Sequence, residues 1–239
     1  MKHIVQSSRQ GILVCGSLNV PFANEHFVSV ITKADGSCAL HATWGYPSYT
    51  CKNQMLSLPQ GQSQGRKQCS DLLDDSLNIM RLRLGESIFF IDVLTSLWNE
   101  LTVPAIIEQN CSPEGKIFWQ MLCEKKPALA QRAKLTVEKE KKKENCLDNF
   151  NEEAWSVYKD CIQHKDYFFS TSELLMFANL TGVNLVVSTY TDGVFQVAGC
   201  SVDDKLLHNP VYVSINIDNN NNFRGHYERI WPLLSQCKE

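Results

Sequence analysis

The sequence predicts an α+β protein with a small central β-sheet, surrounding helices and a large helical insertion. Short apolar runs bounded by turn residues occur near both ends of the chain, for example at 27–31 and 183–187, and such runs are typical of strands. Between about 51 and 165, apolar residues recur at helical spacing instead, and charged residues are frequent. Strands grouped at the ends, with helices grouped between them, are typical of an α+β layout with a largely local sheet.

Composition limits the class of protein. The chain has 239 residues, of which 44% are apolar and 21% charged, as in ordinary soluble globular proteins. That length fits one domain covering 1–239, with a helical lobe at 51–165 inserted within it. The net charge of −3 gives no electrostatic reason to expect a nucleic-acid partner. No apolar run approaches the ~18 residues of a membrane span, and residues 1–10 do not resemble a secretory signal peptide.

The ten cysteines are scattered along the chain rather than paired. Because C-x-x-C and H-x-x-x-H spacings are missing, there is little reason to expect zinc. Many of the cysteines stand in apolar segments, where a free thiol behaves as a small hydrophobic residue, and a chain of this length does not need disulfides to hold its core. We therefore expect mostly structural thiols in a reducing, cytoplasmic compartment, with no metal and no cofactor.

The first elements lead to a cysteine. Residues 11–31 mix short apolar runs with turn residues, which predicts one or two strands or loops. Residues 39–44 then continue without a breaker until Gly45, which predicts a short helix that begins at or just after Cys38. A thiol in that position is favoured as a thiolate by the helix dipole and by free backbone N–H groups.

The inserted region is predicted to be helical because its leucines form stripes at helical spacing. Helices are expected at 70–84, 88–101, 116–123 and 134–145. Pro104 and Pro113 are expected to break them. The last of these segments is dense in charge, and its opposite charges at helical spacing predict a solvated helix.

After the insertion the strands return. The expected elements are a helix at 173–180 preceded by Ser172 and ended by Gly182, strands at 183–187, 194–197 and 211–217, and a strand that opens at His226. Residues 211–217 alternate apolar and polar side chains with a period of two, which is typical of a strand with one buried face.

Two short segments carry residues suited to catalysis. Asp35-Gly36-Ser37-Cys38 is a turn that delivers a cysteine to the start of an apolar helix, and Gly225-His226-Tyr227-Glu228 presents a histidine far away in sequence. A nucleophilic thiol needs a histidine that is near it in space, not in sequence. Taken alone, Cys38 could be a core cysteine and His226 a surface histidine at a strand end. His41, about one helical turn after Cys38, could pair with it locally, although a packed histidine is the simpler interpretation.

The cysteine segment resembles the Asp-Gly-Asn-Cys nucleophile segment of the ovarian-tumour (OTU) family of deubiquitinating cysteine proteases, with Ser37 where that family usually has Asn. Residues 168–187 resemble the family's helix-then-strand unit, and residues 211–230 resemble its closing histidine segment. The three segments stand in the family's order and cover about half of the chain. Residues 51–165 carry no match to the family's core, but a long helical insertion there is similar to that of bacterial effector members.

The resemblance implies a papain-like fold and hydrolysis of the isopeptide bond after the C-terminal glycine of ubiquitin. Cys38 would attack as a thiolate, His226 would act as general base and then as general acid, and backbone donors at 35–38 would hold the oxyanion. No cofactor is implied. The implied partners are ubiquitin and polyubiquitin chains, and an effector of this kind would act in the cytosol of a host cell.

The third catalytic residue is less well defined. The family often has Asn or Asp two residues after the histidine, and here that position holds Glu228. A strand places His226 and Glu228 on the same face, so the carboxylate could orient the imidazole. Glutamate is one methylene longer than aspartate, and Asp35, or Asn24 before the cysteine, could orient the site instead.

Two other classes of function remain open. The chain could be a ubiquitin-binding module with a degenerate catalytic site, or a cysteine peptidase or acyltransferase that acts on an unrelated substrate. The insertion is expected to hold ubiquitin through apolar side chains with nearby acids. The best candidates are Asp71, Asp74 and Asp75 beside Leu72, Leu73 and Leu77, although these leucines could equally pack within the lobe.

Overall fold

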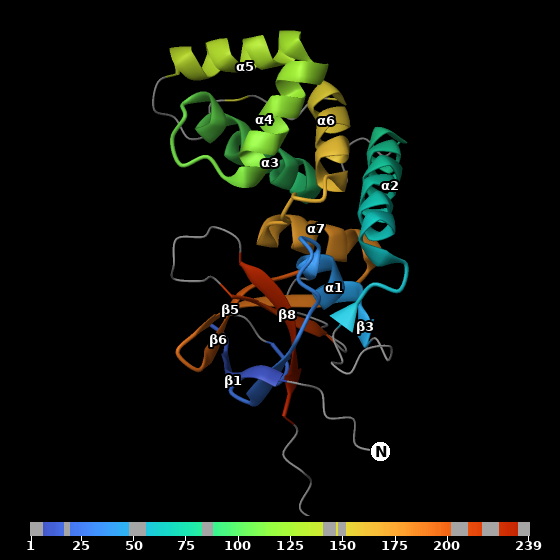
Figure 1. Cartoon of the computed structure of the whole chain (residues 1–239), viewed down its shortest axis with the longest axis vertical. Helices are drawn as coiled ribbons and strands as arrows, with labels where there is room; N and C mark the ends of the chain where they lie inside the picture. Colours follow the sequence, from blue (N-terminus) through green and yellow to red (C-terminus); the bar gives the residue numbers. More distant parts are fainter. Residues whose placement is uncertain are drawn as a thin grey trace, which may run out of the picture. The chain divides into compact units, whose positions relative to one another are not determined.

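The protein has a mixed α/β architecture of helices and strands (Figure 1). The computed structural model describes residues 7–16, 20–47, 56–82, 88–140, 147, 152–201, 210–216 and 225–233. The chain divides into two compact units, one formed by Met1–Gly65 with Phe169–Glu239 and the other by Arg66–Phe168. The expected α+β class is confirmed at this level, because six long strands belong to the first unit and most of the helices to the second. No described helix has the length and apolar character needed to cross a membrane.

The first unit is built on a closed six-stranded barrel rather than on an open sheet. Its strands are β1 (Ser7–Val14), β2 (His26–Val30), β5 (Leu185–Thr191), β6 (Val194–Cys200), β7 (Val211–Asn216) and β8 (His226–Pro232), in the order β1-β2-β8-β7-β5-β6. The barrel closes where Ile12–Val14 of β1 pairs in parallel with Val194–Gln196 of β6. Gly11 permits this approach, because a Cβ there would overlap the carbonyl oxygen of Gly193. Closure leaves both edge strands paired, so neither edge is open to another chain.

Apolar side chains from all six strands form the core of the barrel. The core consists of Leu13, Val20, Phe27, Val186, Phe195, Val197, Tyr212 and Ile230. The ring of Phe27 meets that of Tyr212 edge to face, with centroids 5.0 Å apart. The Tyr212 hydroxyl donates to the carbonyl of Pro21 at 2.6 Å, which satisfies its polar end.

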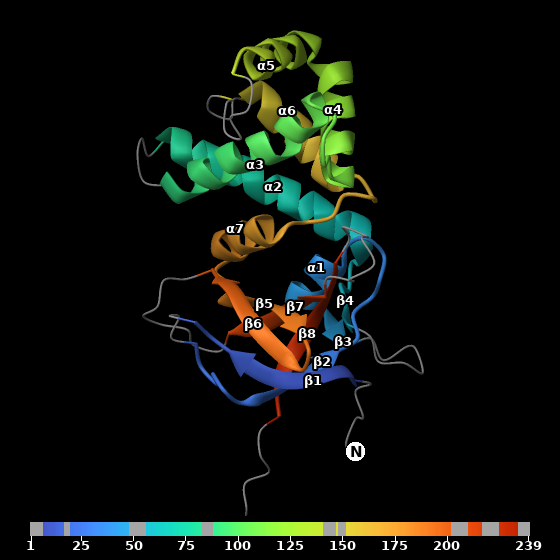
Figure 2. The ribbon, with the colours of Figure 1, turned by 90° about the vertical axis from the view of Figure 1, so that its left-hand side faces the viewer.

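Two helices of the first unit, α1 (Cys38–Trp44) and α7 (Thr171–Thr181), lie on the same side of the barrel (Figure 2). α7 begins two residues earlier than expected, because Ser170 and Glu173 form a reciprocal capping box that fixes the N-terminus there. It ends at Gly182, which has φ +68 and was predicted as the stop. A two-stranded sheet of β3 (Tyr46–Pro47) and β4 (Leu56–Ser57) follows α1.

The second unit is helical. Its elements are α2 (Gly61–Leu82), which begins in the first unit, α3 (Ile88–Ile106), α4 (Pro113–Lys125), α5 (Pro127–Lys139) and α6 (Glu152–Gln163). Pro104 does not break α3 where the sequence predicted, since the helix runs two residues further. Pro113 does mark a boundary, because it is the first residue of α4 after the cap at Ser112. The charge-dense segment predicted as a helix at 134–145 is helical up to Lys139, and 141–145 lies outside the described residues.

Buried contacts tie these helices together. Trp98 of α3 packs edge to face against Phe118 of α4 at 5.8 Å. Arg66 is almost fully buried and donates to the carbonyl oxygens of Ile162 at 2.7 Å and Tyr167 at 2.6 Å. The guanidinium therefore binds a carbonyl in the last turn of α6, where a cation is stabilised by the helix dipole, and a second carbonyl in the segment that follows the helix.

Candidate active site

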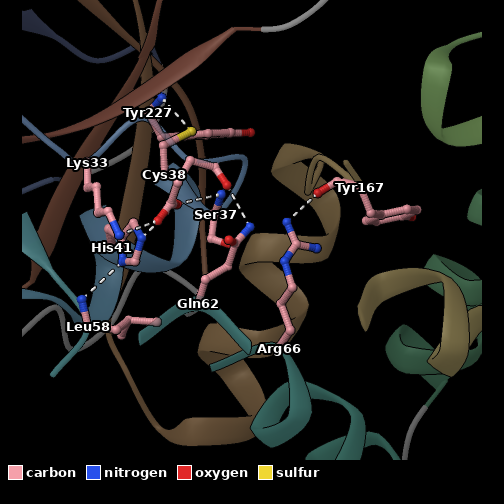
Figure 3. Close-up of polar contacts among 10 residues, drawn as sticks. Lys33, Ser37, Cys38, His41, Leu58, Gln62, Arg66, Tyr167 and Tyr227 are labelled. Carbon is pink, nitrogen blue, oxygen red and sulfur yellow. Dashed lines mark hydrogen bonds and ion pairs between the residues drawn. The ribbon is translucent and has the colours of Figure 1, made fainter. Parts of the chain in front are cut away.

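The nucleophile motif folds into a tight turn that places Cys38 at the first position of α1. Gly36 has φ +78, a conformation that favours glycine, and the Asp35 carboxylate accepts the Ser37 N–H at 3.2 Å across the turn. The backbone carbonyl of Asp35 accepts a hydrogen bond from the Gln62 side chain at 2.6 Å (Figure 3). The short helix predicted to begin at Cys38 does begin there.

The Cys38 sulfur lies among backbone N–H groups and away from water. The side chain is only 1% exposed, and the Tyr227 N–H donates to the sulfur at 3.4 Å (Figure 3). Burial raises the pKa of the Cys38 thiol, the charge on Asp35 raises it further, and the N–H groups of Tyr227, Ala39 and Cys38 itself lower it. The net direction is upward, so the buried sulfur is a thiol surrounded by donors that suit a thiolate.

His41 is bound to Asp35 and not to the thiol. Its Nε2 lies 2.8 Å from the Asp35 carboxylate, and its Nδ1 accepts the Leu58 N–H at 3.0 Å (Figure 3). Because Nδ1 accepts, the ring proton is on Nε2 and His41 is the neutral tautomer that donates to Asp35. The imidazole is 1% exposed, so His41 is a packed histidine that supports the turn.

Asp35 is held as a carboxylate. Burial opposes its ionisation, but the Lys33 ammonium at 3.0 Å, together with His41 and the Ser37 N–H, outweighs burial and lowers the pKa of Asp35 below its usual range. These contacts organise the loop that precedes Cys38. The contacts of Asp35 are therefore with its own loop, α1 and Gln62.

His226 is the first residue of β8 and is half-buried. Burial lowers the pKa of His226, as does the charge on Arg9, whereas Glu228 and a hydrogen bond with the Thr32 backbone raise it. The net direction is downward, so the imidazole is neutral at neutral pH, as a general base requires.

The structure brings the cysteine and histidine segments together through the backbone. Side chains alternate along β8, so Tyr227 and Arg229 project from the face that meets α1. His226 and Glu228 then project from the opposite face, which also carries the core residue Ile230. Between the described atoms of Cys38 and His226 there is accordingly no hydrogen bond, and the sulfur contacts the peptide N–H next to the histidine instead.

Glu228 lies in a polar layer of the barrel interior. It is 5% exposed and stands opposite Ser214 of β7, which in turn pairs with Ser188 of β5. All three of these residues are buried, and Glu228 is close enough to raise the pKa of His226. Of the predicted site residues, Cys38 and Asp35 thus share one neighbourhood, and His226 and Glu228 share another. Asn24, the other orienting candidate, is an exposed turn residue with φ +66.

Arg229 is a contributor that the sequence did not reveal. Its guanidinium donates to the carbonyls of Ala42 and Thr43, each at 2.6 Å, and so holds the C-terminal end of α1 against β8. In the sequence, Arg229 is visible only as a cation on the same face of the histidine strand as Tyr227. A cation at such a position is equally typical of a solvent-exposed strand, so its contact with α1 could not be predicted. Gln62 carried no signal, because its contact with Asp35 depends on where α2 begins.

Within the described residues, no group of three or more His, Cys, Asp and Glu side chains is arranged to hold a metal ion. Comparisons of this chain with protein-family models, with curated proteins and with solved structures returned no match.

Proposed function

We propose that this protein is a thiol-dependent deubiquitinase with a papain-like fold of the OTU type, which hydrolyses the isopeptide bond after the C-terminal glycine of ubiquitin. The observation that supports the proposal best is the placement of Cys38. Its sulfur stands at the start of α1 among three backbone N–H groups, and one of these belongs to the residue next to His226. Together with the motif resemblance, this placement favours nucleophilic chemistry over a packing role for Cys38.

The reaction assigned to these residues has two steps. His226 takes the thiol proton, the Cys38 sulfur forms a bond to the carbonyl carbon, and the negative charge moves to the oxygen, where backbone N–H groups stabilise it. The intermediate then collapses, His226 gives its proton to the departing lysine amine, and a thioester remains. Water attacks the thioester, His226 accepts its proton, and ubiquitin leaves with a free carboxylate while the thiol is restored.

The proposal includes a rearrangement on substrate binding. In the structure the sulfur is 1% exposed and the His226 imidazole projects from the opposite face of β8. We therefore assign the observed arrangement to the substrate-free protein, and the start of β8 must turn His226 toward the sulfur before proton transfer. The proposed setting is the cytosol, that of a host cell if the protein is an effector, with ubiquitin chains as partners.

A second candidate is a ubiquitin-binding module without catalytic activity. The specific observation in its favour is the same separation of the two neighbourhoods: Asp35 is committed to His41, and Glu228 belongs to the polar layer inside the barrel. If those contacts are permanent, the thiol has no base. A peptidase or acyltransferase for an unrelated substrate is the third outcome of the experiment below.

Ubiquitin carrying a C-terminal electrophile distinguishes these functions. The deubiquitinase should form a covalent adduct that mass spectrometry locates at Cys38, and Cys38→Ala should abolish it. Cys161→Ala is the matched control, because that thiol is also fully buried in a helix but belongs to the other unit. Binding without an adduct would assign the chain to the ubiquitin-binding class, and the absence of both would assign it to another substrate.

A further inference from the structure

The helical unit contains a cavity that plays no part in the proposed chemistry of Cys38. Its volume is about 500 Å³, within the range of small-molecule sites. It is lined by Ala105, Glu108, Asn110, Cys111, Lys116, Trp119 and Gln120. These residues come from the C-terminal end of α3, the loop that follows it and the first turns of α4.

The wall of the cavity is held in a defined shape. Glu108 and Asn110 have φ +55 and +49, a left-handed conformation that costs energy for residues other than glycine and that the surrounding structure must impose. Gly115 fixes α4 close to this loop, since a Cβ there would lie 3.0 Å from the Leu101 carbonyl oxygen and 3.1 Å from the Cys111 sulfur. The cavity is therefore preformed and not a gap left by a loose loop.

The lining combines less exposed, largely apolar residues with two exposed residues of opposite charge. Ala105, Cys111 and Trp119 are half-buried, whereas Lys116 and Glu108 are exposed. The indole of Trp119 offers a flat surface for an aromatic ring. A cation and an anion that line one cavity are complementary to a ligand that carries both charges.

We propose that this cavity binds an aromatic α-amino acid, with its ring against Trp119, its carboxylate paired with Lys116 and its ammonium paired with Glu108. The proposal does not depend on the chemistry of Cys38. It assigns a separate protein contact to the ring, the carboxylate and the ammonium of the ligand. Removing the ligand's amine charge should weaken binding unless Glu108 is also changed, and removing its carboxylate charge should weaken binding unless Lys116 is changed.

Cys111 provides a local readout, because this half-buried residue lines the cavity and occupancy should shield its thiol from alkylation. The rate of iodoacetamide labelling at Cys111 would be followed by peptide mass mapping in the full chain. Cys123 of α4 is exposed, does not line the cavity and serves as the internal control. The probes are L-phenylalanine, N-acetyl-L-phenylalanine, which lacks the amine charge, L-phenylalaninamide, which lacks the carboxylate, and L-alanine, which lacks the ring.

L-phenylalanine should slow labelling of Cys111 and leave Cys123 unchanged, and each single-charge probe should bind about tenfold more weakly, the equivalent of about 1.4 kcal/mol. L-phenylalaninamide should bind to Lys116→Met as tightly as L-phenylalanine binds to that variant. N-acetyl-L-phenylalanine should bind to Glu108→Gln as tightly as L-phenylalanine binds to that variant. Lys139→Met, an exposed residue of α5, is the matched control and should keep the wild-type order. The proposal is overturned if no probe slows labelling of Cys111, if Cys123 is protected equally, or if the two variants keep the wild-type order of probes.

Discussion

At Cys38, burial raises the pKa of the thiol and backbone N–H groups lower it. The proposed activity depends on which of these two effects changes when the substrate binds. Cys38→Ala should abolish diubiquitin cleavage, a loss of about 10⁴-fold or more, because the Cys38 sulfur forms the thioester in the proposed mechanism. The free energy of unfolding should fall by only about 1–2 kcal/mol, mainly because the buried Tyr227 N–H loses its acceptor. His226→Ala should be nearly as inactive. The measurements are gel-based cleavage of diubiquitin and urea denaturation.

Cys161→Ala is the control for this prediction, since it removes another fully buried thiol and should keep full activity. Turnover by Cys38→Ala within about tenfold of the wild type would overturn the assignment of the nucleophile.

Glu228 should orient His226 rather than transfer a proton. Glu228→Gln keeps a hydrogen-bonding group and should lower kcat/KM only moderately, whereas Glu228→Ala should lower it more. The carboxylate raises the pKa of His226, so both variants should shift the acid limb of the rate–pH profile to lower pH. A merely structural role would not move that limb. If neither variant changes the rate or the profile, the orienting group lies elsewhere.

Asp35 should contribute stability that depends on pH. Its pKa is lowered in the folded protein, so its contribution is present above the unfolded-state value of 3.8 and is lost as the pH falls through the folded-state value. Asp35→Asn should therefore be less stable than the wild type at about pH 7, and the difference should shrink toward about pH 3. Urea midpoints over this range test the prediction, with the exposed Asp71→Asn as control. A difference that does not vary with pH would contradict it.

At the scale of elements, Arg229 of β8 holds the C-terminal end of α1 in place. Arg229→Met should cost about 2–4 kcal/mol of unfolding free energy, because two carbonyls at the end of α1 lose a largely buried cation. Arg132→Met is the matched control: its ion pair with Glu153 is exposed and should be worth less than about 1 kcal/mol. Equal changes in the two urea midpoints would show that Arg229 does not hold α1.

Elements defined by local signals were predicted well from the sequence. The turn at Gly36 and the end of α7 at Gly182 each depend on a glycine whose own backbone preference decides the outcome. The prediction for α7 was wrong only at its start, because Ser170 and Ser172 both qualify as caps and only Ser170 stands three residues before Glu173. The predicted break at Pro104 was wrong because this proline stands in the last turn of α3, only two residues before the helix ends at Ile106.

At the scale of the whole molecule, the features that could not be predicted join residues far apart in the chain. The parallel pairing of β1 with β6 closes the barrel across about 180 residues, and no local pattern encodes which strands become neighbours. The same limit applies to the site. The sequence could place Cys38 and His226 in adjoining segments, but the face from which His226 projects depends on the register of β8 against β2 and β7.

We predict that the helical unit contributes to ubiquitin binding, which presupposes the proposed function. Leu73 is fully buried in its own unit and Asp74 pairs with Lys159, so these two candidates have structural partners. Asp71 is exposed on α2, so Asp71→Lys reverses a surface charge without breaking a described ion pair. If this surface meets the basic rim of ubiquitin, Asp71→Lys should raise KM about two- to fivefold, as expected for a solvated charge pair, and leave kcat unchanged.

Alkylation of Cys38 by a small reagent should proceed at the wild-type rate, which separates docking from thiol chemistry. Glu138→Lys on α5 is the control, and an equal change of KM in both variants would mean that long-range charge, not contact with this face of α2, controls binding.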